Sequence, residues 1–246
     1  MASLSRPLAI LELFEEGSLS WTVEEIGQAL HIPASTVYRH VRMLVQAGLL
    51  DPGKGGAYQL GPAFIRYDRI SRQGDELIRE AAPRMRDLLE LTTQSATVIL
   101  CRRFKDCVMC VHEELGAKPH PSTSYERGIA MPMFRGASSK AILANLPDRN
   151  LRSIYLGNEK DIRQTGVKDW VSFKEQMRAI RRAGVAVTDS EVAVGRVGIA
   201  APLFRSGLVI ASLSMVFIPK TRERKMIPDF SLSVKQAAEA LNDLSR

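Results

Sequence analysis

No apolar stretch of this sequence reaches the 18 residues that a membrane-spanning helix needs. The amino-terminal residues MASLSRPLAILELFEEG also lack the basic flank and the long apolar segment of a signal peptide, because acidic residues follow a short apolar run. These absences predict a cytoplasmic protein that does not act at a membrane.

Cysteine is scarce. Three cysteines in 246 residues are too few for a disulfide framework, and their odd number indicates a reducing compartment. Cys107 and Cys110, with Cys101 and His112 nearby, suggest a metal site. However, the segment CVMCV has the pattern of a strand, in which Cys107 and Cys110 point to opposite faces, and a structural zinc site needs four converging ligands. We therefore predict no metal and no other cofactor.

Several catalytic signatures are missing as well. We find no G-x-S-x-G elbow, no H-E-x-x-H motif and no Walker-type phosphate loop. Asp189 and Glu191 alternate along a strand-like segment with no third partner evident, and we expect a structural role for Glu191. No catalytic residue is predicted.

The composition that remains is that of a folded protein, with 45% hydrophobic and 25% charged residues. The net charge of +7 favours a polyanionic partner. The excess is unevenly distributed: residues 1–75 hold seven Lys and Arg against eight Asp and Glu, whereas residues 76–246 hold 27 against 19. Any argument for nucleic acid in the first part must therefore rest on where its charges lie.

The first 60 residues have the pattern of three short helices followed by a hairpin. A helix containing Leu8 and Leu11 ends before Gly17, and the next begins at Thr22 with a T-x-x-E capping box. In the third helix, Val37, Val41, Leu44 and Val45 form one apolar face. The following segment LLDPGKGGAYQLG predicts a hairpin whose tip carries Lys54. This order predicts a winged helix-turn-helix domain.

The third helix is suited to read DNA, because polar and cationic side chains lie off its apolar face near the amino-terminal end that enters a major groove. Lys54 at the wing tip can reach a phosphate. The predicted DNA-binding residues are Ser35, Thr36, Tyr38, Arg39, His40, Arg42 and Lys54. Any three-helix bundle exposes polar residues, so this pattern alone leaves a winged helix that binds only protein as an alternative.

The segment TVEEIGQALHIPASTVYRHVRMLVQAGLLDPGKGGAYQLGP resembles the DNA-binding module of IclR-type transcriptional regulators. The match extends to RGASSKAILANLP and to GVAVTDSEVAVGRVGIAAPLF followed by ASLSM, so nearly the whole chain is covered. The resemblance implies a GAF-like effector-binding domain, a homodimer or homotetramer, and no catalysis. The positions that carry it in the first domain are Pro33, Ser35, Thr36, Arg39, Leu44, Gly48, Tyr58, Leu60 and Gly61.

Beyond residue 97, short apolar strands mixed with helices predict an α+β domain. The expected strands include TVILC, CVMCV, GVAVTD, GIAAPLF and LVIASLSMVFI, and the expected helices cover 136–145, 171–183 and 231–244. We predict a winged helix-turn-helix domain over 1–61, a linker helix over 62–76 and an effector-binding domain over 77–246.

The small residues Gly136, Ala137 and Ser138 precede a predicted helix, where free backbone N–H groups and the helix dipole favour an anion. Arg196 stands in an otherwise small and apolar stretch and can pair with a carboxylate, although a solvent-facing Arg196 is an equal alternative. The resemblance implies effector contacts at Gly136, Ala137, Thr188 and Ser214, whereas the family usually has an uncharged residue at the position of Arg196. The predicted effector-binding residues are Met133, Gly136, Ala137, Ser138, Thr188, Arg196, Gly198 and Ser214. Gly198 and Val216 depart from the side chains that the family often has, so the effector's identity does not carry over.

These observations predict a DNA-binding transcriptional regulator whose binding to double-stranded operator DNA responds to a small organic acid. The alternative is an enzyme or a protein-interaction module with an accessory winged-helix domain. Whether the protein represses or activates is not evident from the sequence.

Overall fold

The computed structural model describes residues 6–91, 96–116 and 125–244, and its contacts divide the chain into two compact units, Met1–Asp75 and Glu76–Arg246. The range predicted as a linker helix, 62–76, spans helix α4 (Ala63–Gly74), Asp75 and the first residue of helix α5 (Glu76–Glu90). No helix in the described ranges is long and apolar enough to cross a bilayer.

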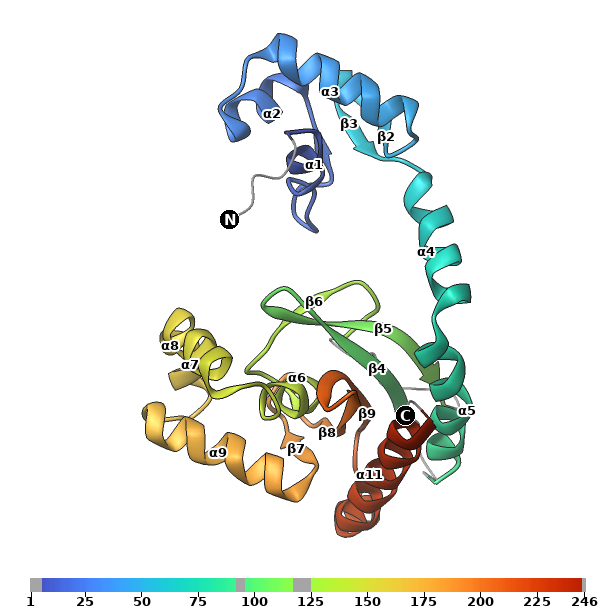
Figure 1. Cartoon of the computed structure of the whole chain (residues 1–246), viewed down its shortest axis with the longest axis vertical. Coiled ribbons are helices and arrows are strands. Elements are labelled where there is room, and N and C mark those ends of the chain that lie inside the picture. Colours follow the sequence, from blue (N-terminus) through green and yellow to red (C-terminus); the bar gives the residue numbers. More distant parts are fainter. Residues whose placement is uncertain (1–5, 92–95, 117–124, 245–246) are drawn as a thin grey trace. The chain divides into compact units, whose positions relative to one another are not determined.

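The first unit is built on three helices, α1 (Arg6–Leu11), α2 (Val23–Leu30) and α3 (Ala34–Gln46) (Figure 1). The predicted capping box starts α2: Thr22 Oγ1 accepts from the Glu25 backbone N–H at 3.2 Å, and Glu25 Oε2 accepts from the Thr22 N–H at 2.8 Å. A buried core of Ile10, Val23, Ile26, Val37, Val41, Leu44 and Leu50 joins the helices. Helix α1 ends at Leu11, earlier than the periodicity suggested.

The wing follows α3 directly. Strands β2 (Leu50–Pro52) and β3 (Tyr58–Leu60) pair antiparallel, and the 3-10 turn Lys54–Gly56 joins them. A two-residue strand, β1 (Ser20–Trp21), completes a sheet of order β1-β3-β2. Strand β1 was not predicted, because two residues are too short to show a strand period.

The second unit is built on a six-stranded antiparallel sheet of order β6-β5-β4-β9-β8-β7. Strands β4 and β5 are longer than the apolar segments that predicted them. The strands are β4 (Ala96–Phe104), β5 (Cys107–Leu115), β6 (Ala130–Pro132), β7 (Ala186–Asp189), β8 (Val197–Arg205) and β9 (Leu208–Phe217).

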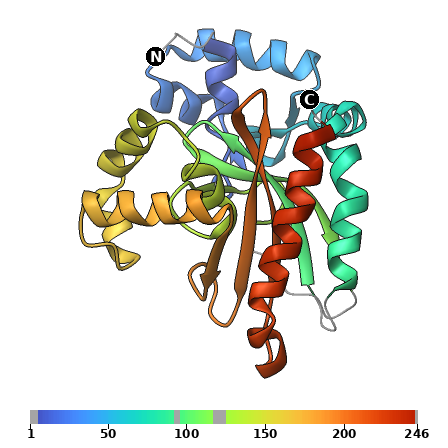
Figure 2. The same cartoon turned by 60° about the horizontal axis from the view of Figure 1, so that its bottom comes forward.

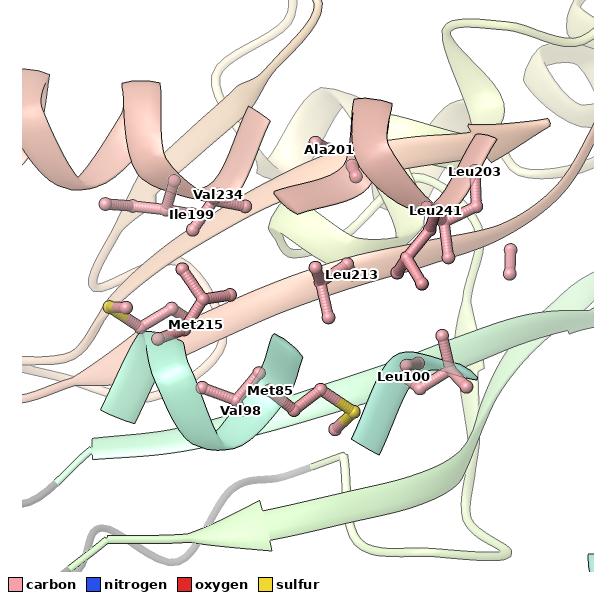
Figure 3. Packing of buried hydrophobic residues seen from close by; sticks show 14 of the residues in the cluster. Met85, Val98, Leu100, Ile199, Ala201, Leu203, Leu213, Met215, Val234 and Leu241 are labelled. Atoms are coloured by element: carbon pink, nitrogen blue, oxygen red, sulfur yellow. The ribbon is translucent and has the colours of Figure 1, made fainter. Parts of the chain in front are cut away.

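One face of this sheet is covered by α5 and the carboxy-terminal helix α11 (Ile227–Leu244), which lie side by side (Figure 2). Figure 3 shows how Met85 of α5 and Val234 and Leu241 of α11 pack on the sheet. The sheet residues that they meet include Val98, Leu100, Ile199, Ala201, Leu203, Leu213 and Met215. A short helix, α10 (Thr221–Lys225), precedes α11.

The opposite face is covered directly by α6 (Ala137–Leu143), on which α9 (Trp170–Ala183) packs, and α7 (Asp148–Gly157) and α8 (Glu159–Gln164) join the same buried cluster. Helices α7 and α8 escaped prediction, because Leu151, Ile154 and Tyr155 supply helical spacing over a single turn only. Helix α6 lies close against the sheet since only small side chains separate them: Ala137, Ala141, Ala186 and Ala200 form a buried cluster. The α+β class predicted for this half is confirmed.

Candidate functional site

The outer face of α3 presents the groups that the sequence assigned to DNA. Ser35, Arg39 and Arg42 are exposed, Tyr38 is 60% exposed and Thr36 is half-buried. They lie outside the buried stripe because that stripe recurs every three to four residues along the helix. This face offers hydroxyl and guanidinium groups that can donate to base edges and phosphates.

His40 does not belong to this face. Its side chain is only 9% exposed and lies on the inward side of α3, three residues after Val37 and four before Leu44. The expectation that His40 lies off the buried stripe is therefore wrong. The physical reason is that positions 37, 40, 41 and 44 all fall on one helical face.

Lys54 is exposed in the turn of the wing, where Gly55 and Gly56 take left-handed conformations with φ of 66° and 77°. Residues with side chains rarely adopt these angles, so the glycines make the tight turn possible. The turn projects Lys54 beyond the two strands.

The second candidate site is a pocket in the second unit, at the start of α6. Gly136 precedes the helix with φ of 83°, and a Cβ there would lie 2.6 Å from the Tyr125 hydroxyl and 2.8 Å from Val192. The pocket holds about 410 Å³ of space free of protein atoms, including its mouth to solvent. Its walls are formed by Tyr125, Gly136, Ala137, Ser138, Thr188, Glu191, Val192, Ala193, Arg196, Gly198, Ser214 and Val216.

The predicted effector residues converge here from three parts of the sequence, with one exception. Thr188, Gly198 and Val216 are cross-strand neighbours on β7, β8 and β9 and form one row of the floor. Met133 does not line the pocket; it is 1% exposed and packs in the apolar cluster beneath α6. An unbranched apolar side chain four residues before the first residue of a buried helix is suited to fill such a core.

The loop 190–196 between β7 and β8 forms another wall, through Glu191, Val192, Ala193 and Arg196. Of these residues only Arg196 was predicted to contact the effector. Glu191 was expected to have a structural role, because no partner for it is evident in the sequence. Tyr125 was also missed. The nearby sequence gives no signal for it, since it is brought to the pocket by tertiary packing alone.

Several polar groups face this space. Burial raises the pKa of the Tyr125 phenol, which therefore stays protonated; its hydroxyl donates to the Arg135 carbonyl at 2.6 Å and lies 2.8 Å from Ser139 Oγ. Ser214 Oγ donates to the Ile199 carbonyl at 3.1 Å, so its lone pairs can still accept from a ligand. The Ser138 hydroxyl is buried with no nitrogen or oxygen partner among the described residues, and it neighbours the Cys101 thiol.

Two contacts to Glu191 fasten the loop 190–196, one from α6 and one from Arg135, which precedes that helix. Lys140 Nζ lies 2.7 Å from Glu191 Oε1, and Arg135 Nε donates to the Glu191 carbonyl at 3.0 Å. At the end of β7, Arg224 of α10 pairs with Asp189. Arg224 is the largest influence that holds the pKa of the Asp189 carboxyl below its usual range.

The three cysteines were the metal-ligand candidates of the sequence. Cys101 and Cys110 oppose each other across β4 and β5 as buried free thiols, and burial raises the pKa of Cys101. The Cys110 thiol donates to the His112 carbonyl at 3.3 Å. In the part of the chain that the structure describes, no three His, Cys, Asp or Glu side chains gather as metal ligands would.

Two family models match the chain. The model described as "Bacterial transcriptional regulator IclR C-terminal" matches residues 71–243, and the "IclR helix-turn-helix domain" model matches residues 3–52. The probable regulator ArcR of Halobacterium salinarum is 25% identical over 207 residues, which cover 82% of this chain and 77% of that protein.

Solved structures agree on the fold. An IclR transcriptional regulator from Alicyclobacillus acidocaldarius superposes with a TM-score of 0.80 at 18% identity and covers 98% of this chain and 97% of that one. An IclR homologue from Microbacterium hydrocarbonoxydans, crystallised with 4-hydroxybenzoate, gives a TM-score of 0.67 at 21% identity, covering 96% of this chain and 98% of that one.

Proposed function

The chain belongs to the IclR family of bacterial transcriptional regulators, and on that premise we propose that a small organic acid in the α6 pocket controls its binding to a two-fold operator. The observation that carries the proposal is the pocket itself, which brings Gly136, Ser138, Thr188, Arg196 and Ser214 together. Sites of this kind pair a mostly apolar lining with a few orienting polar groups.

On DNA, α3 enters the major groove and its exposed side chains read base edges, while Lys54 contacts the phosphate backbone. Arg39 and Arg42 have the guanidinium forks that pair with guanine. The support for this assignment is their exposure on the outer face of α3, together with the family of the domain.

In the pocket, the ligand's carboxylate pairs with Arg196, and the hydroxyls of Ser138, Thr188 and Ser214 bind its remaining polar atoms. Val192, Ala193 and Val216 supply apolar contact for its carbon skeleton. The relative from Microbacterium hydrocarbonoxydans holds 4-hydroxybenzoate, an acid of this class. The second unit binds such a ligand without chemical conversion, in keeping with relatives that are named as regulators.

The functional oligomer is a homodimer that pairs through α4. None of the residues of α4 is buried, yet Phe64, Tyr67 and Ile70 lie within about a third of its circumference. They are 37%, 51% and 52% exposed, which leaves an apolar stripe on the surface. A second copy of α4 covers this stripe, and two copies match the two half-sites of an operator.

The effector assignment is tested with Arg196→Ala. We expect the variant to keep operator binding but to lose at least tenfold in affinity for 4-hydroxybenzoate, because the bidentate pair with the carboxylate is gone. Calorimetry measures the ligand, and fluorescence anisotropy with DNA from upstream of the gene measures operator binding. Unchanged ligand affinity would remove Arg196 from the site. Failure of the unaltered protein to bind this DNA even at low salt would overturn the regulator assignment.

A further inference from the structure

A buried ion pair lies beside the pocket, and its acidic member, Glu191, belongs to the pocket lining. The side chain of Lys140, in α6, is 7% exposed, that of Glu191 is 16% exposed, and Nζ and Oε1 are 2.7 Å apart. Removing two charges from water is costly unless each offsets the other. The sequence suggested only a structural role for Glu191, but a side chain that lines the pocket also determines which charges the pocket tolerates.

The charge of the pocket depends on this pair. Among the residues that line it, Glu191 is the acidic side chain and Arg196 the basic one, whereas Tyr125 stays neutral because burial raises its pKa. Lys140 touches Glu191 from the α6 side and cancels its negative charge. Without Lys140, an anionic ligand would meet an uncancelled carboxylate in a poorly solvated wall, where like charges repel strongly.

We propose that Lys140 is a specificity-determining residue: by neutralising Glu191, it makes the α6 pocket select an anion over a neutral molecule of the same shape. This inference rests on the proposed effector function. A carboxylate ligand is expected to bind more tightly than its amide, and the preference should depend on the charges at positions 140 and 191. The pair also ties the loop 190–196 to α6, so a purely structural role must be distinguished from an electrostatic one.

The experiment uses acid and amide pairs, 4-hydroxybenzoate with 4-hydroxybenzamide and pyruvate with pyruvamide, titrated calorimetrically into the full-length protein. In Lys140→Met we expect acid affinity to fall at least tenfold, while amide affinity changes less than threefold. In Lys140→Met/Glu191→Gln, which removes both charges, acid affinity recovers most of this loss. In Glu191→Gln alone, the ratio of acid to amide affinity rises severalfold, because Lys140 is left uncancelled.

Glu191→Gln keeps the experiment decisive if Lys140→Met fails to fold, since it retains the shape of the wall and predicts a change in the opposite direction. An equal loss of acid and amide affinity in Lys140→Met, or an unchanged ratio in Glu191→Gln, would show that the pair only fastens the loop and would overturn this inference alone. If the unaltered protein bound neither acid, the effector assignment would fail, and this inference with it.

Discussion

At the scale of single residues, Arg39 carries the sharpest prediction for DNA recognition. Arg39→Ala should weaken operator binding about tenfold or more, because one good pairing with a base edge discriminates by roughly 1–3 kcal/mol. Arg69→Ala, which removes another exposed arginine, on α4, is the matched control and should change operator affinity little. Fluorescence anisotropy at fixed salt measures both. A loss of similar size in the two variants would indicate general electrostatic attraction, without readout by α3.

Single residues also show where sequence patterns reach their limit. The row of Thr188, Gly198 and Val216 unites three strands in the pocket floor, and two of these positions were predicted as effector contacts. Met133 was misplaced because two residues of loop suffice to turn a side chain from a pocket into a core. Tyr125 could not be found, because its role depends on packing between segments far apart in sequence.

At the scale of elements, the capping box of α2 predicts how the first unit responds to substitution and pH. Thr22→Ala should lower its stability by about 1 kcal/mol, because an orphan backbone N–H loses its acceptor. The hydrogen bonds from Thr22 hold the pKa of the Glu25 carboxyl below its usual value of 4.5. The stability that Glu25 contributes is therefore complete above that value and is lost as the pH falls through the lowered pKa.

Thermal unfolding followed by circular dichroism between pH 3 and 7 checks both expectations. Ser20→Ala, an exposed neighbour outside the capping box, is the control and should leave the transition of the first unit in place. A transition that ignores Thr22→Ala would mean that tertiary packing alone holds the start of α2.

Elements that are long enough to show a hydrophobic period, or that have clear capping residues, were predicted well, and short elements were not. Helices α2, α3 and α9 have apolar stripes and caps that a sequence displays. Strand β1 and helix α8 span two and six residues, too few for a period to appear. His40 was misjudged for a related reason: α3 buries a wider stripe than its aliphatic residues alone mark out.

At the scale of the whole molecule, assembly through α4 is the prediction to test. Tyr67→Glu places a charge in the apolar stripe and should shift the protein from dimer to monomer, with at least a tenfold loss of operator affinity because two half-sites are no longer held together. Ile65→Glu is the matched control: Ile65 is 76% exposed on the opposite side of the same helix. Analytical ultracentrifugation measures the mass, and a dimer that survives Tyr67→Glu would mean that pairing uses another surface.

The left-handed turn at Gly136 also matters to anyone who wishes to turn this regulator into a biosensor. A side chain at that position would collide with Tyr125 and Val192, so the backbone corner of the pocket cannot be varied without losing its shape. Thr188, Ala193 and Val216 border the same space without that constraint on φ, and all three are half-buried. A mutant library that diversifies these three positions and keeps Gly136, Lys140 and Glu191 fixed would explore new ligands on an intact scaffold.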